Sequence, residues 1–189
     1  MFTKHICSFL AILMLLVVAG AGADDDKPAV KNIKAINWED LGSCLPDKVE
    51  GMDVGEVDGG SLEMTDPSDP KTKISYSTAN RIYTATKNKD KSVTLNILDS
   101  NFYQFLLMPF MMAMEIDTPS GSVKSDKVAD FPAKVIIQKD EGEITGISYL
   151  ILVSERILVS AEADENVAPK EIENLLEKVD FEKLAKLTK

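Results

Sequence analysis

The chain has 189 residues, with 31 acidic and 21 basic side chains and a formal net charge of −10 at pH 7. Binding to nucleic acid or to anionic lipid needs clustered Lys and Arg, so this charge balance argues against both as partners. The length suits one domain with a substantial apolar core.

Residues 1–23 have the features of a secretory signal peptide. A basic start at Lys4 and His5 precedes an apolar run over 6–19, and small residues at 21–23 suit a signal peptidase. The run is too short and wrongly flanked for a membrane anchor. We expect cleavage near Ala23, a periplasmic or secreted location, and no stable membrane span afterwards.

Signal cleavage removes the one histidine, His5, and leaves Cys44 as the one cysteine. Cys44 cannot then form an internal disulfide, and it is either a buried small apolar residue, which we favour, or a reactive thiol. Without histidine, Ser-His-Asp, Cys-His and H-E-x-x-H sites are excluded. The processed sequence also has no P-loop or G-x-G-x-x-G motif. We therefore predict that the protein is not an enzyme, and we assign it no cofactor.

The processed chain divides into a flexible acidic leader over residues 24–36 and a single domain over residues 37–189. At the start of the domain, Asn37 can cap a short helix that runs through Leu41, and Pro46 prevents its continuation. Linkers long enough to separate two domains are absent from the sequence.

Alternating apolar and polar residues predict strands in the next part of the chain. The Gly59-Gly60 pair indicates a bulge or a turn within the first of these strands, and the pattern of the second breaks near Asn80. The predicted strands are 54–64, 73–86 and 92–98, joined by turns at 65–71 and 87–90.

Charged residues in this region have structural interpretations. Asp53, Glu56 and Asp58 precede the glycine pair without the spacing of an EF-hand, so we interpret them as solvated acids rather than a Ca²⁺ site. The only two arginines, Arg81 and Arg156, fall at predicted strand positions. A guanidinium pairs with a carboxylate in a planar geometry that Lys reproduces poorly, so we predict a structural ion pair for each.

Residues 105–116 read FLLMPFMMAMEI and hold four of the six methionines of the processed chain. As a helix, this stretch is apolar nearly all round, with a narrow polar strip at Gln104 and Glu115. Pro109 must kink or restart it, because the proline ring opposes the carbonyl of the preceding turn. The apolar run is too short to span a membrane.

The Met-rich stretch has three interpretations, which we rank. The first is a kinked helix in the core of the domain, because methionine fills irregular gaps. The second is a partner-binding face formed by Met108, Met111 and Glu115. The third is a soft-metal site, in which the thioethers of Met108, Met111 and Met112 would bind Cu(I) without the usual His or Cys.

The C-terminal half reads as an antiparallel meander followed by helix. Residues 121–128 form a polar edge strand, whereas 149–153 are apolar on both faces and belong to a central strand. Pro169 lies in the first turn of a helix, and Asp180 can cap a last helical turn. The further strands are 133–138, 143–153 and 156–162, and the apolar stripe of the helix is Ile172, Leu175, Leu176 and Val179.

The order of elements predicts an α+β fold. We expect an antiparallel β-sheet of about six or seven strands, with a central kinked helix and a C-terminal helix packed on it. A strand after a turn at Phe-Pro-Ala (131–133), a paired apolar strand, an ERILVS strand and a closing helix together resemble small exported proteins of the PsbP/Mog1-like class. The similarity covers most of residues 50–187.

The PsbP/Mog1-like resemblance implies a fold more than a function, because members of that class are often non-enzymatic accessory or assembly factors. It carries no functional residue over to this chain. We therefore predict an exported soluble, non-enzymatic accessory or binding factor of the cell envelope, with a protein as its partner. The alternative is a periplasmic protein that binds a small molecule or Cu(I) through the Met-rich helix.

Overall fold

The computed structural model describes residues 34–66, 69–100, 110, 115–154 and 156–189. The helices in this part of the chain are α2 (Trp38–Gly42), α4 (Pro169–Leu176) and α5 (Phe181–Leu187). The strands are β1 (Met52–Val54), β2 (Asp58–Asp66), β3 (Asp69–Ala85), β4 (Ser92–Ser100), β5 (Ile116–Thr118), β6 (Gly121–Val128), β7 (Phe131–Asp140), β8 (Glu143–Val153) and β9 (Ile157–Asp164).

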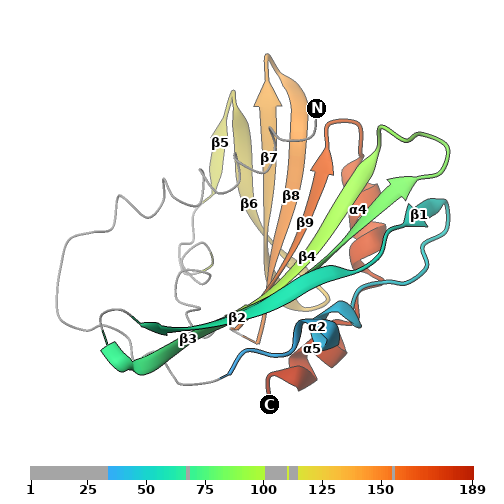
Figure 1. Cartoon of the computed structure of the whole chain (residues 1–189). Coiled ribbons are helices and arrows are strands. Elements are labelled where there is room, and N and C mark those ends of the chain that lie inside the picture. The colour runs from blue at the N-terminus through green and yellow to red at the C-terminus, as the bar shows by residue number, and fades with distance from the viewer. Residues whose placement is uncertain (1–33, 67–68, 101–109, 111–114, 155) are drawn as a thin grey trace.

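All nine strands belong to one antiparallel sheet. Its order is β1-β3-β4-β9-β8-β7-β6-β5, and β2 pairs with β3 along the same edge as β1. Helix α2 contacts β2 and β3, α4 contacts β9, and α5 contacts β8. Figure 1 shows the long strands β2 and β3 running out to one side as a pair, while β5 to β9 stand together at an angle to them.

The expectation of six or seven strands around a central kinked helix is wrong. The described structure is 54% strand and 15% helix, and helices α2, α4 and α5 are 5, 8 and 7 residues long. The helix expected around the Met-rich stretch falls at residues 101–109 and 111–114, which lie outside the described part. Short strands at the sheet edge, β1 and β5, account for the higher strand count, because three residues are too few for an alternating pattern to be recognised.

Two expected interruptions are continuous strand in the structure. β2 passes through Gly59-Gly60, which pair with Ala79 and Thr78, and β3 passes through Asn80, which pairs with Asn96 of β4. A Cβ atom at Gly59 would stand 2.5 Å from the Thr78 carbonyl oxygen and 2.6 Å from the Trp38 ring. The first glycine of the pair therefore permits close packing against α2, and no turn occurs there.

The C-terminal half follows its prediction more closely. Residues 149–153 of β8 are buried between β7 and β9, which confirms a central strand. The strand over 121–128 is not the edge, because β5 pairs with it on the outside. Asp180 caps α5 by accepting from the Lys183 N–H at 2.8 Å, as expected.

The core lies between one face of the sheet and the helices. Leu95 and Ile97 of β4 have no exposed surface, and neither do Ile172 and Leu184 of the C-terminal helices. Cys44 joins this cluster with 2% exposure, and burial raises the pKa of its thiol, so the buried interpretation is confirmed. Burying such side chains contributes roughly 1.5–3 kcal/mol each.

Both arginines form the predicted ion pairs. The Arg156 guanidinium donates to both carboxylate oxygens of fully buried Asp99, at 2.6 and 2.8 Å. The same two side chains hold the start of the domain, since Asp99 accepts from the Ile36 N–H and Arg156 donates to the Lys34 carbonyl. Arg81 donates to Asp47 at 2.6 Å. Residues 34–36, placed in the leader, are thus hydrogen bonded to the sheet.

Candidate binding surface on the outer face of the sheet

The sheet has two faces, and the strand registers assign residues to each. Val93, Leu95 and Ile97 of β4 are buried toward the helices, so Thr94, Asn96 and Leu98 point the opposite way. We call this second side, which turns away from α2, α4 and α5, the outer face. Residues directly opposite in neighbouring strands share a face, so the outer face can be followed from strand to strand.

Four large apolar side chains lie together on the outer face of β2 and β3. Leu62 pairs with Tyr76 and Met64 pairs with Ile74, and Tyr76 lies opposite Ser100 of β4. Leu62 is 42% exposed, Met64 45% and Tyr76 38%. We call these four residues the apolar strip. Clustered exposure of this kind marks an interaction surface, whereas single exposed apolar residues do not.

The apolar strip occupies a projecting part of the sheet. β4 pairs with β3 only as far as Tyr76, so within the described chain residues 69–75 pair with β2 alone. We call residues 61–66 and 69–76 the ribbon, and it is the part of β2 and β3 that runs out beyond the other strands in Figure 1. A two-stranded ribbon is only marginally stable in water without support on one face.

The opposite side of the ribbon is polar and serves the domain itself. The hydroxyls of Ser61 and Ser77 are 2.6 Å apart, and Lys73 donates to Glu63 at 2.6 Å. This pairing lowers the pKa of Glu63 and raises that of Lys73, although both side chains are largely exposed. Ser75 accepts from the Ala35 N–H at 2.9 Å. The ribbon is therefore amphipathic, and the chain enters the domain along its polar side.

Charge on the outer face has one sign over β2, β4, β9 and residues 73–84 of β3. β2, β4 and β9 contain no Lys or Arg. In this part of β3, Lys73 lies on the polar side of the ribbon with Glu63, and Arg81 points to the helix side, where it bonds to Asp47 and Pro46. Asp58 lies on the outer face opposite Asn80, and Glu162 opposite Thr94. Burial raises the pKa of Glu162. This part of the surface combines apolar contact with negative charge.

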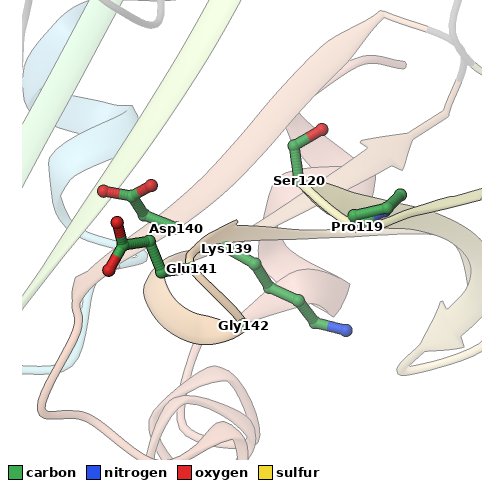
Figure 2. A pocket seen from close by; sticks show the side chains of 6 residues that line it. All are labelled: Pro119, Ser120, Lys139, Asp140, Glu141 and Gly142. Carbon is green, nitrogen blue, oxygen red and sulfur yellow. The ribbon is translucent and has the colours of Figure 1, made fainter.

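A hollow of about 500 Å³ lies elsewhere, where the turns of the β5–β6 and β7–β8 hairpins meet. Figure 2 shows Asp140 and Glu141 pointing to one side and Lys139 to another, so its charged groups do not converge. Ser120 contributes a carbonyl that accepts from the Lys139 N–H at 2.9 Å. A site for a small ligand needs polar groups aimed at one point, and this hollow does not supply them.

The residues named from the sequence are only partly placed by the structure. Met108, Met111 and Met112 lie outside the described residues. Glu115 is exposed directly before β5, at the edge of the sheet opposite to β2, so the structure does not bring it to the apolar strip. Within the described residues, no group of three or more His, Cys, Asp and Glu side chains is arranged to hold a metal ion.

Sequence reasoning missed the apolar strip. The strand predicted over 73–86 contains Ile74 and Tyr76, but a bulge or turn was expected at the glycines of the preceding strand, so Leu62 and Met64 were not placed beside them. The alternation of Leu62, Glu63 and Met64 was the available signal. What it lacked was the register, because only pairing of β2 with β3 brings the four side chains onto one face.

Comparisons with protein-family models, with curated proteins and with solved structures found no match to this chain. Among the described residues, no helix has the length and apolar character needed to cross a membrane.

Proposed function

We propose that this protein is an exported, non-enzymatic binding factor of the cell envelope that docks a partner protein on the apolar strip. The observation that carries the proposal is the joint exposure of Leu62, Met64 and Tyr76 on one face of a projecting ribbon. The export, and the accessory role that the PsbP/Mog1-like resemblance implies, belong to the same proposal.

The energetics of the strip favour a partner over solvent. Apolar surface removed from water contributes roughly 25 cal/mol per Å², and Tyr is enriched among residues that dominate binding energy. Among the described strands the ribbon beyond Tyr76 has only two, and a docked partner would support its exposed apolar side. Both effects stabilise the complex relative to the separate proteins.

Site-specific photo-crosslinking in the native envelope tests the proposal. A photoreactive amino acid at position 62 is expected to capture a distinct partner band, identified by mass spectrometry. The matched control places the same amino acid at Ile144, which is 38% exposed at the far end of β8. Equal capture from both positions, or capture from neither, would contradict a docking surface on the ribbon.

A substitution pair tests the energetic contribution of the strip once the partner is identified. Leu62→Ser combined with Tyr76→Ser is expected to weaken binding by about tenfold or more, because truncating central apolar residues removes most of the contact energy. Ile144→Ser is the control and is expected to leave affinity unchanged. Circular dichroism of each variant establishes that the domain remains folded.

A further inference from the structure

We infer that β2 binds its partner by accepting an extended, cationic segment as an additional strand of the sheet. This inference rests on the proposed function and names the chemistry of the partner. Its three supports are the open edge of β2, the arrangement of acidic residues along that edge, and the incomplete pairing of the ribbon.

The edge of β2 is long enough to hold a strand. β2 runs without interruption from Asp58 to Asp66, nine residues or ~30 Å at about 3.4 Å per residue. Among the described strands it pairs only with β3, so one row of its backbone groups has no strand beside it. Such an edge pairs readily with an extended peptide, whose main-chain hydrogen bonds supply affinity.

The acidic residues along β2 disfavour a second copy of this chain as the occupant. In an antiparallel self-pair that overlaps the whole strand, Asp58 of one copy lies opposite Asp66 of the other at both ends. If the register of this self-pair shifts by two residues, Glu63 of one copy lies opposite Glu63 of the other. Like charges directly opposite each other destabilise a strand pair, so β2 is protected against pairing with itself.

The same charges favour a cationic strand. β2 carries three acidic residues and no basic one, and the outer face of β3, β4 and β9 adds Glu162 but no Lys or Arg over the paired residues 74–84, 92–100 and 157–164. Opposite charges on paired strands stabilise the pair. Apolar residues at alternate positions would extend the apolar strip beside Leu62 and Met64. The expected segment therefore alternates apolar and polar residues and carries Lys or Arg.

Binding of a synthetic peptide to the full-length processed chain tests the inference. The probe has nine residues for antiparallel pairing with β2: lysine at positions 1, 4 and 9 lies opposite Asp66, Glu63 and Asp58, valine occupies positions 3, 5 and 7, and threonine the others. We expect saturable binding that weakens with added salt, measured by fluorescence anisotropy of a labelled peptide. Replacing the three lysines by glutamate is expected to weaken binding by at least about tenfold.

A backbone-modified control separates strand addition from contact with the sheet face. Methylating alternate amide nitrogens of the lysine peptide removes hydrogen-bond donors but keeps every side chain, so it is expected to abolish binding. In the complex, hydrogen exchange of alternate β2 amides is expected to slow by at least about tenfold. Leu62→Lys is expected to weaken peptide binding, whereas Ile144→Lys is expected to leave it unchanged.

The outcomes that overturn the inference are distinct from failure of the proposed function. If the methylated peptide binds as well as the parent, strand addition is wrong and the partner contacts the face alone. If neither peptide binds while crosslinking from position 62 still captures a partner, the cationic strand is wrong and the docking surface stands. Concentration-dependent dimers that are lost in Leu62→Lys would identify a second copy as the occupant and overturn the inference.

Discussion

Asp99 and Arg156 join the start of the domain to the middle of the sheet. Asp99 is fully buried and Arg156 is 13% exposed, so removing one partner leaves the other with an uncompensated charge away from water. We expect Asp99→Ala to lower the free energy of unfolding by about 3–5 kcal/mol, measured by urea titration. Lys186→Ala breaks an exposed pair with Glu182 and is expected to cost under about 0.5 kcal/mol. Equal effects would show that burial does not determine the cost.

Glu162, on the outer face of β9, is expected to make the stability of the protein depend on pH. Burial raises its pKa above the ordinary value of 4.5, so the folded state binds the proton more readily than the unfolded state. Stability contributed by this group is therefore lost as pH rises from 4.5 through the folded pKa. We expect Glu162→Gln to have a higher Tm than the parent at pH 7, and the difference to vanish below pH ~4.

The control for Glu162 is the same substitution at Glu143, which is exposed at the start of β8. Glu143→Gln is expected to leave the Tm difference near zero across the same pH range. A Tm gain for Glu162→Gln that does not change with pH would show that burial of charge is not its cause.

At the scale of elements, two adjacent glycines of β2 have different environments. A Cβ atom at Gly59 would meet the Thr78 backbone and the Trp38 ring, whereas one at Gly60 would meet nothing within 4 Å. We expect Gly59→Ala to cost about 1–3 kcal/mol by forcing α2 away from the sheet. Gly60→Ala is expected to be neutral or slightly stabilising, because alanine restricts the unfolded chain. Urea unfolding measures both, and a similar cost for the two variants would contradict the contact with α2.

At the scale of the whole molecule, stability is expected to fall from the centre of the sheet toward the ribbon. β8 lies between two strands and its residues 149–153 are buried, whereas the ribbon beyond Tyr76 has two described strands and an exposed apolar side. Native-state hydrogen exchange is expected to give amides of β8 the slowest rates and those of 61–64 the fastest in the sheet. Equal protection of both would mean that the ribbon is covered in the isolated protein.

Local sequence signals identified several elements of the fold correctly. Asn37, Pro169 and Asp180 located helix starts, because capping chemistry depends on residues within one turn. The residues over 149–153 are apolar on both faces of their strand, and this pattern predicted the central strand, because a strand covered on both faces excludes polar residues. The three-residue edge strands were not identified, since their formation depends on a long neighbour rather than on their own sequence.

The sequence by itself determined the acidic character and the antiparallel meander of the C-terminal half, whereas the secretory signal and its cleavage stay predictions. These properties depend on composition and on neighbours a few residues away. Only the tertiary structure decided that Gly59 is a packing position, that Arg156 holds Asp99 and the start of the domain, and that the apolar strip exists. The physical reason is register: residues 62 and 76 are far apart along the chain, and pairing of β2 with β3 alone places them side by side on one face.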